Sequence, residues 1–163
     1  MADPAFPPEA PKDCPLCPRL VAFRAENKEA HPDWFNGAVP SFSAAAGDET
    51  VKLLVIGLAP GMQGANRTGR PFTGDYAGDL LYATLLEHGF ARGTYGRSPE
   101  DGLELVETMI TNAVRCLPPQ NKPTGQEINT CRPYLLSRLE ALPHLRTMVA
   151  LGKIAHDSVV RAL

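Results

Sequence analysis

Four cysteines are the residues whose type and spacing point most directly to chemistry. They are Cys14, Cys17, Cys116 and Cys131, and the chain contains no others. Neighbouring thiolates two residues apart, like the first pair, can share one metal centre without straining the backbone. Structural zinc sites usually have two close pairs, whereas the second pair is widely spaced. An iron–sulfur cluster therefore suits the pattern at least as well as zinc, and four unrelated thiols are the alternative.

A glycine-rich stretch is the second feature with chemical potential. Residues 57–75 read "GLAPGMQGANRTGRPFTGD" and follow the apolar run "VKLLVI". Loops between a strand and a helix usually take about two to six residues, and long loops at the carboxyl end of a strand are where α/β proteins bind ligands. The stretch lacks the Gly-Lys-Ser/Thr of a Walker A loop and the glycine spacing of a dinucleotide fingerprint. It therefore predicts a ligand that approaches bare backbone.

Side chains in and near this loop could recognise a flat, polar ligand. Phe72 could stack on a base or fill the core beneath the loop, and both interpretations are open. Asn112 is predicted at the carboxyl end of a strand, where its amide could read the edge of a base or simply tie neighbouring loops. Asp75 and Asp79 could each cap the next helix, and we expect Asp79 to do so. None of the four histidines forms a metal-ligand pair.

Alternating strands and helices are predicted to position these residues. Nearly continuous apolar runs predict buried strands at 51–58, 108–114 and 145–152. Apolar residues at helical spacing predict helices at 14–30, 77–89 and 153–163. A further helix follows the capping-box sequence "TGQE" and runs to about residue 142. This order predicts a parallel sheet with helices on both faces, although three strands make a small sheet.

Composition is typical of one soluble globular domain. The chain has 163 residues, of which 44% are hydrophobic and 21% charged, with a net charge of −2. No run approaches the roughly 18 apolar residues of a membrane span. The acidic, proline-rich residues 1–13 lack the basic and apolar regions of a signal peptide. We expect them to form a disordered lead and the protein to be cytoplasmic.

Together these pieces resemble the uracil-DNA glycosylase superfamily, in particular its iron–sulfur family 5 (type B) enzymes. The matching segments are, in order, "CPLCPRL", "GLAPGMQGANRTGRPFTGD", "ITNAVRCLPPQNKPT" and "TCRPYL". They cover nearly the whole chain from Cys14 onward. The related family 4 has an acidic residue after the first glycine of the glycine-rich motif, where this chain has Leu58. That difference favours family 5.

The resemblance implies a fold, a cofactor and an activity. The fold would be a three-layer α/β/α sandwich around a central parallel sheet, formed by residues 14–163. The four cysteines would hold a [4Fe–4S] cluster with no redox role in catalysis. The enzyme would act on DNA as a monomer and begin base excision repair. It would flip uracil, or another deaminated base such as hypoxanthine, out of the duplex and hydrolyse the N-glycosidic bond.

The resemblance also implies roles for individual residues. Phe72 would stack on the base and Asn112 would hydrogen-bond its edge, while Asp75 is the main candidate, and Asn66 a weaker one, for positioning the attacking water. Arg67 or Arg70 would meet phosphates. The implied catalytic residues are Asp75 and Asn112, and the implied substrate-binding residues are Gly57, Leu58, Ala59, Pro60, Gly61, Asn66, Arg67, Arg70 and Phe72.

One departure from the family and two rival functions are open. The family carries a further strand and a His-Pro-Ser loop, and nothing after Gly152 matches that loop. We therefore expect this domain to lack its C-terminal part. The first alternative function is a metal-stapled nucleic-acid-binding or scaffold domain without catalysis. The second is an unrelated α/β enzyme that uses the glycine-rich loop for a phosphorylated metabolite.

Overall fold

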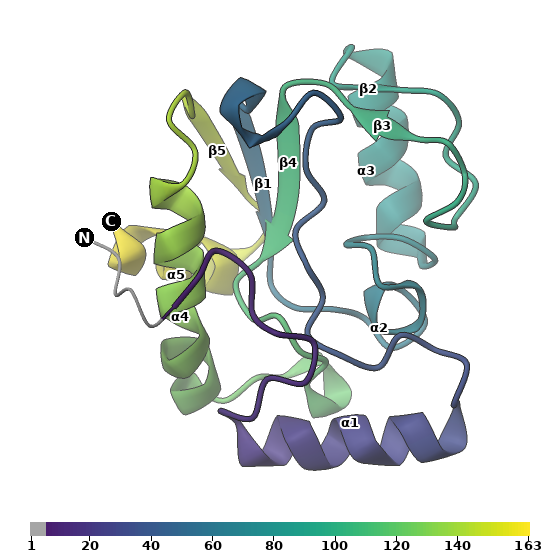
Figure 1. Ribbon diagram of the computed structural model, residues 1–163, viewed down its shortest axis with the longest axis vertical. Helices are drawn as coiled ribbons and strands as arrows, with labels where there is room; N and C mark the ends of the chain where they lie inside the picture. Colours follow the sequence, from purple (N-terminus) through teal and green to yellow (C-terminus); the bar gives the residue numbers. More distant parts are fainter. Residues whose placement is uncertain (1–5) are drawn as a thin grey trace.

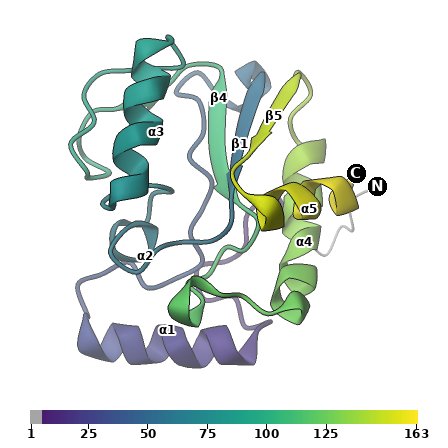
Figure 2. The same ribbon diagram turned by 180° about the vertical axis from the view of Figure 1, so that it is seen from behind.

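A parallel three-stranded sheet between helices forms the centre of the computed structural model, which describes residues 6–163 (Figure 1). The strands are β1 (Leu53–Gly57), β4 (Thr108–Asn112) and β5 (Thr147–Ala150), in the order β4-β1-β5. Helix α3 (Tyr76–Glu87) covers one face. Helices α4 (Gly125–Glu140) and α5 (Lys153–Ala162) cover the other, as the view from behind also shows (Figure 2). The predicted α/β sandwich and its three strands are confirmed.

Burial on both faces explains the apolar run that predicted β1. Leu54 and Ile56 are fully buried in the cluster that packs against α4 and α5. Val55 points to the opposite face, where it joins the cluster around Tyr82 of α3. Successive side chains of a strand alternate between faces, so a strand covered on both sides must be apolar at nearly every position.

Helices α1 and α2 and the turn η2 lie at the carboxyl end of the sheet, whereas η1, β2 and β3 lie toward its amino end (Figure 1). Helix α1 begins at Pro18, not at Cys14 as predicted, because proline is well suited to the first helical position; Cys14 and Cys17 therefore lie before the helix. Among residues 6–163, no helix is long and apolar enough to cross a membrane. The remaining elements are α1 (Pro18–Ala30), η1 (Asp48–Thr50), α2 (Ala65–Thr68), β2 (Ala91–Arg92), β3 (Glu104–Leu105) and η2 (Pro119–Asn121).

The predicted capping box at the start of α4 is confirmed, and it also ties α4 to α1. The Thr124 hydroxyl accepts from the Glu127 N–H at 3.2 Å, and the Glu127 carboxylate accepts from the Thr124 N–H at 3.1 Å. Arg19 of α1 donates to Glu127 from Nε at 2.6 Å and from Nη2 at 2.9 Å. One carboxylate thus satisfies a helix end and anchors a second helix.

The start of the chain differs from the expected disordered lead. Residues 1–5 lie outside the described residues, but residues 6–13 pack along α4 (Figure 1). Glu9 forms ion pairs of 2.5 Å with both Arg115 and Arg138. The Phe6 carbonyl accepts from the Ser137 hydroxyl at 2.5 Å. The composition of this segment indicated disorder, but its ordering depends on two buried arginines more than one hundred residues away.

Candidate functional site

The glycine-rich loop leaves β1 at the carboxyl edge of the sheet, where Gly57 pairs in register with Asn112 of β4. A Cβ atom at Gly57 would lie 2.5 Å from both the Asn112 Oδ1 and the Phe72 ring. The position therefore admits only glycine, because any side chain would push apart the two groups that meet over it. Two of the residues predicted to recognise a base are thus brought together by a third.

The Asn112 side chain carries an acceptor without a donor. Its Oδ1 is buried and has no hydrogen-bond partner among the described residues, and the residue as a whole is 3% exposed. The backbone around it is fixed, since the next N–H, of Ala113, donates to the Gly57 carbonyl at 2.9 Å. A buried acceptor left unpaired costs about 1–3 kcal/mol. An N–H group of a ligand entering the pocket would remove that cost.

Phe72 has the left-handed backbone conformation, with φ of 53°. A large side chain adopts it only where surrounding contacts enforce it, and here Tyr82 and Tyr95 donate to the carbonyls of Pro71 and Phe72 at 2.5 and 3.3 Å. The ring both packs against the cluster beneath α3 and lines the pocket. The two interpretations of Phe72, core residue and stacking platform, are therefore compatible.

Asp75 caps helix α3, which corrects the expectation that Asp79 would do so. Its Oδ1 accepts from the Gly78 N–H at 3.3 Å. Asp79 instead lies in the first turn and pairs with Arg97. The other Asp75 oxygen, Oδ2, occupies the space that a side chain at Gly61 or Gly64 would need. It lies 2.7 Å from a Cβ added at Gly61 and still closer to one added at Gly64. The glycines let the loop close over this carboxylate.

These residues enclose a pocket of about 200 Å³ at the carboxyl ends of β1 and β4. Most of its walls are small side chains and backbone. Its lining residues are Ala59, Pro60, Gly61, Ala65, Phe72, Asp75, Ala77, Asn112 and Asn121. The sequence predicted six of them and missed Ala65, Ala77 and Asn121.

Asn121 comes from the turn η2 after β4, and its distinguishing feature is a backbone conformation that the sequence does not show. Both Gln120 and Asn121 have positive φ, of 55° and 57°, and consecutive residues of this kind away from glycine often occur at functional sites. The turn lies at the carboxyl edge of the sheet, near α2 (Figure 2). It belongs to the "NKPT" part of a motif singled out in the sequence, but the residue type alone gives no role.

Five of the implied binding residues lie outside the lining of this pocket, namely Gly57, Leu58, Asn66, Arg67 and Arg70. Three of these, Leu58, Asn66 and Arg70, make contacts elsewhere in the protein. Leu58 is half-buried, and its carbonyl accepts from the Val114 N–H at 2.9 Å. Asn66 is 1% exposed, and its Nδ2 donates to Asn36 Oδ1 at 3.2 Å, so it ties two loops together. Neither side chain meets the space where a water or a base would sit.

Arg70 is the third, and the structure contradicts its expected contact with phosphate. Its two terminal nitrogens donate to the Asp101 carboxylate at 2.9 and 2.8 Å, and its Nε donates to Thr73 at 2.8 Å. The guanidinium lies 4.9 Å from the centre of the Phe42 ring, and the residue is 6% exposed. Burial alone would lower the pKa of Arg70, but the hydrogen bonds to Asp101 outweigh it and the pKa is raised. This arginine holds the loop in shape from within.

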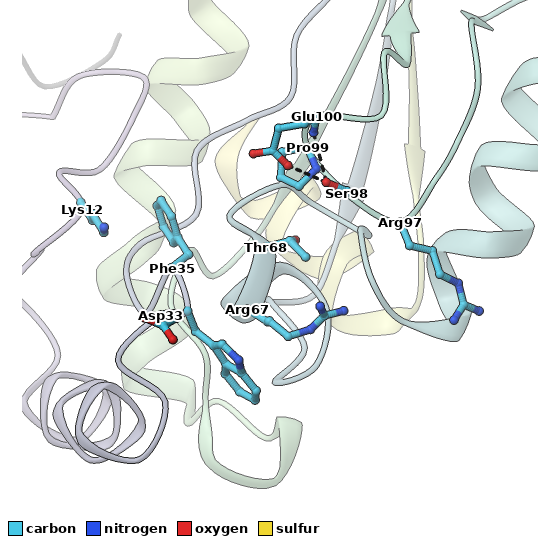
Figure 3. Close-up of a pocket in the computed structure, with 10 residues that line it drawn as sticks. Lys12, Asp33, Phe35, Arg67, Thr68, Arg97, Ser98, Pro99 and Glu100 are labelled. Atoms are coloured by element: carbon cyan, nitrogen blue, oxygen red, sulfur yellow. Dashed lines mark hydrogen bonds between the residues drawn. The ribbon is translucent and has the colours of Figure 1, made fainter.

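Arg67 lies half-buried on α2, beside a second and more polar cavity of about 560 Å³ (Figure 3). Its Nε and Nη2 donate to the carbonyls of Gln63 and Gly74 at 2.8 and 3.2 Å. Lys12 lies 4.5 Å from the centre of the Phe35 ring on the far side of the same cavity. Arg67 has no carboxylate partner in the described chain, so its charge is compensated only by backbone carbonyls.

The four cysteines converge from three segments that are distant in sequence. Cys14 and Cys17 precede α1, Cys116 follows β4 and Cys131 lies in α4, and all four line one small cavity. All are free thiols. Burial, followed by the negative charge of Cys131, raises the pKa of Cys17 to about 11 and that of Cys116 to about 12. The site therefore disfavours the charged, thiolate form of these two cysteines.

Two kinds of metal centre are bound by four cysteines in proteins, a single zinc ion and a four-iron cluster. Among residues 6–163, no three Cys, His, Asp or Glu side chains converge as one metal ion requires. A tetrahedral zinc ion needs every sulfur about 2.3 Å from one point. A four-iron cluster is bound by four cysteines placed around a larger body, one thiolate to each iron. The four thiols share a cavity of only about 20 Å³.

Comparison with known proteins gives one family. The sequence model of the uracil DNA glycosylase superfamily matches residues 44–162. A type-5 uracil-DNA glycosylase from Thermus thermophilus is 45% identical over 153 residues, which are 90% of this chain and 67% of that protein. One from Pyrobaculum aerophilum is 39% identical over 155 residues, 93% of this chain and 66% of that protein. A type-4 uracil-DNA glycosylase from the same archaeon is 31% identical over 153 residues, 93% of this chain and 62% of that protein. The chain thus spans about two thirds of the length of these relatives.

Proposed function

Because this chain belongs to the uracil-DNA glycosylase superfamily, we propose that it excises uracil from DNA. The single observation that carries the proposal is the buried, unpaired Oδ1 of Asn112, which faces Phe72 across Gly57. A flat ligand with an N–H group on its edge fits this arrangement. Uracil has such an edge, and a flipped base could enter the pocket from the duplex at a cost of a few kcal/mol for unstacking.

The Asn112 amide accounts for the choice of base. The Oδ1 accepts the ring N–H of uracil, while the side-chain NH₂ donates to the adjacent carbonyl. Cytosine presents an unprotonated ring nitrogen at that position, so two acceptors would face each other and the pocket would stay unsatisfied. Phe72 supplies a stacking face that tolerates any base. Selectivity therefore comes from Asn112 and affinity from both residues.

The same edge chemistry extends to hypoxanthine. That base also carries a ring N–H beside a carbonyl, and its second ring needs additional space. The walls at Ala59, Gly61, Ala65 and Ala77 are small, which supports accommodation of a larger deaminated base. We place hypoxanthine second to uracil because nothing in the lining addresses its imidazole ring.

The reaction proposed is hydrolysis of the N-glycosidic bond through an oxocarbenium-like sugar. The bond between the sugar C1′ and the base nitrogen breaks with its electron pair leaving on the base. Water adds to C1′, and the proton that this water loses ends on the released base. The developing charge on the uracil carbonyls is stabilised by the Asn112 NH₂. Asp75 positions the water, since its carboxylate lies in the pocket wall and is held by the Gly78 N–H. Arg67 is the candidate for contact with a backbone phosphate.

We also propose that the four cysteines hold a [4Fe–4S] cluster. When bound, the cluster would supply the positive charge that stabilises the four sulfurs as thiolates, and it would link the segment before α1 to α4. Cys116 lies in the same connection between β4 and α4 as Asn121, so fixing the cysteine also restrains one wall of the base pocket. The supporting observation is the common cavity of the four thiols. About four irons and four sulfides per anaerobically purified chain are expected, and zinc alone would contradict the proposal.

The test of the function is excision from a labelled duplex with one uracil, measured in single turnover. Phe72→Ala and Asn112→Ala should each lower the rate by about a hundredfold or more while the protein stays folded. Asn27→Ala, which removes a buried amide outside the pocket lining, is the control for general damage. The non-catalytic alternative predicts DNA binding without any excision by the unaltered protein, and that result would remove the glycosylase proposal.

A further inference from the structure

The polar cavity of about 560 Å³ beside α2 is distinct from the base pocket. Among the described residues, the two spaces share no lining side chain. The cavity lies between the loop after α1, helix α2 and the connection from β2 to β3 (Figure 3). Its lining includes two aromatic and three cationic side chains, those of Trp34, Phe35, Lys12, Arg67 and Arg97. Aromatic rings beside cations are the combination that binds single-stranded nucleic acid.

Trp34 is held in position by its own loop. Its ring stacks on that of His31, with the ring centres 3.8 Å apart and the planes within 6° of parallel. The buried Asn36 amide donates to the carbonyls of His31 and Trp34 at 2.8 and 3.3 Å, so a side chain closes the turn that carries the tryptophan. The indole is half-buried and lines the cavity. A base that stacks on it therefore orders little of the protein on binding.

The same loop is tied to α2. The Phe35 N–H donates to the Arg67 carbonyl at 3.0 Å. The Asn36 N–H donates to the Asn66 carbonyl, also at 3.0 Å, and the two asparagine side chains are hydrogen-bonded at 3.2 Å. A Cβ added at Gly69 would lie 2.6 Å from the Phe35 ring, so the glycine lets this ring reach the end of α2. The aromatic and cationic groups thus share one frame.

The charges along the cavity favour an anion modestly. Two carboxylates, of Asp33 and Glu100, also line it, but both residues are exposed, where water and salt screen them. Arg97 is already paired with a carboxylate of α3. Among residues 6–163, neither Lys12 nor Arg67 pairs with a carboxylate. Two cations therefore remain for phosphate groups, and the rings must supply most of the selectivity.

We propose that this cavity binds an unpaired nucleotide of single-stranded DNA, with its base stacked on Trp34 and its phosphate beside Arg67 or Lys12. Helix α2 separates the cavity from the base pocket. Ala65 lines the pocket, whereas Arg67, two residues later and about 200° around the helix, lines the cavity. The separation is the thickness of one helix, about 10–12 Å with side chains. A few nucleotides of one strand can span it.

The proposal concerns unpaired DNA because Trp34 needs a base with a free face. Bases within a duplex are stacked on their neighbours, whereas bases of a single strand can turn out onto an aromatic side chain. Binding in the cavity does not rest on the proposed function, but its consequence for the substrate does. If the chain excises uracil, the cavity favours uracil in single-stranded or frayed DNA over uracil in an intact duplex.

The first experiment uses the single tryptophan of the chain as its probe. The unaltered protein is titrated with an oligomer of eight deoxycytidines, whose bases the proposed Asn112 contact disfavours. We expect Trp34 emission to change and saturate with the dissociation constant that fluorescence anisotropy of the labelled oligomer gives. An abasic oligomer of equal length carries the phosphates alone and should bind at least about tenfold more weakly. Absence of binding, equal binding of the two oligomers, or binding that leaves Trp34 emission unchanged would overturn the proposal.

Variants then locate the bound strand. Trp34→Leu should weaken binding of the labelled deoxycytidine oligomer by about tenfold, whereas Trp34→Phe, which keeps a stacking face, should retain most of it. Lys12→Gln should weaken binding and reduce its salt dependence. Lys52→Gln is the matched control, because Lys52 precedes β1 at the amino end of the sheet and lies outside the cavity. Equal effects of the two lysine variants would contradict the assignment.

Excision is measured separately from binding. Loss of excision from every uracil substrate, with binding of the deoxycytidine oligomer intact, counts against the proposed function alone. Normal excision without binding of that oligomer counts against the cavity alone. If both hold, Trp34→Leu should slow excision from a single strand more than excision from a duplex.

Discussion

At the scale of single residues, Asn112 combines a fixed position with an unsatisfied acceptor. The empty protein bears the cost of that buried oxygen, about 1–3 kcal/mol, and the ligand that supplies a donor relieves it. The residue therefore weakens the free protein slightly and favours the bound state. The neighbouring Phe72 also carries a local cost, because its backbone is in the left-handed conformation. Hydrogen bonds from Tyr82 and Tyr95 to the carbonyls of Pro71 and Phe72 hold it there.

Gly57→Ala should damage the site more than the fold. The new Cβ would collide with the Phe72 ring and the Asn112 oxygen, each 2.5 Å away, so one of the two must move. We expect single-turnover excision to fall at least about tenfold and the unfolding free energy to fall by about 1–3 kcal/mol. Gly125→Ala at the start of α4 is the control, since nothing lies within 4 Å of its added Cβ. Retained excision in Gly57→Ala would show that the contact is not needed.

Asp75 performs two tasks that substitution can separate. Asn is a good helix cap, so Asp75→Asn should keep α3 stable while removing the charge that positions water. The expected result is a rate lower by about 10²–10⁴-fold with a melting temperature within about 2 °C. Asp75→Ala should lose the rate and about 1 kcal/mol of stability as well. If Asp75→Asn excises uracil at the normal rate, the water must be positioned by another residue.

At the scale of elements, the sequence predicted the features that depend on neighbouring residues, but it did not predict contacts between residues distant in the chain. The capping box before α4 and the three apolar strands follow from neighbouring residues, and the structure confirms them. The roles expected for Arg70 and Asn66 failed because their partners, Asp101 and Asn36, are about thirty residues away. Nothing in a single sequence indicates which arginine will find a buried carboxylate. The pocket itself was predictable only where motif residues converge on one sheet edge.

The segment before α1 gives a prediction about pH. Burial alone would raise the pKa of Glu9, but the charge of Arg115, a hydrogen bond from Ser41 and the charge of Arg138 together lower it below its ordinary value of 4.5. A lowered pKa means that the carboxylate stabilises the fold above pH 4.5, and that this stabilisation is lost as the pH falls through the folded value. Acid should therefore release this segment.

Glu9→Gln tests that prediction. At pH 7 the variant should be less stable by about 1–2 kcal/mol, because Arg115 and Arg138 lose a charged partner, and the difference should vanish in strong acid. The measurement is chemical denaturation at several pH values. Glu29→Gln, at an exposed position of α1, should show no such dependence. A pH-independent difference for Glu9→Gln would argue that packing, not charge, holds the segment.

At the scale of the whole molecule, the cysteine site brings together the segment before α1, the connection after β4 and helix α4. Oxidative removal of the proposed cluster with a chelator should lower the melting temperature by about 4–8 °C, the shift expected for a loss near 2 kcal/mol. Differential scanning fluorimetry under anaerobic conditions would measure it. The variant with serine at all four positions should melt at the lower temperature and not respond to the chelator. If the chelator leaves the melting temperature of the native protein unchanged, the cysteine site does not contribute to global stability.

The convergence of the four thiols also means that the cysteine site cannot form until its last residue, Cys131, has been synthesised. Cys14 and Cys17 leave the ribosome more than one hundred residues before Cys131, and at ordinary rates of translation that interval lasts roughly 5–25 seconds. During it the early cysteines are exposed to oxidants with no completed site to receive them. The contacts of Glu9 with Arg115 and Arg138 wait for the same late segments. The residues before α1 are thus made early but reach their final contacts late. Oxygen during translation should therefore limit the yield of active protein.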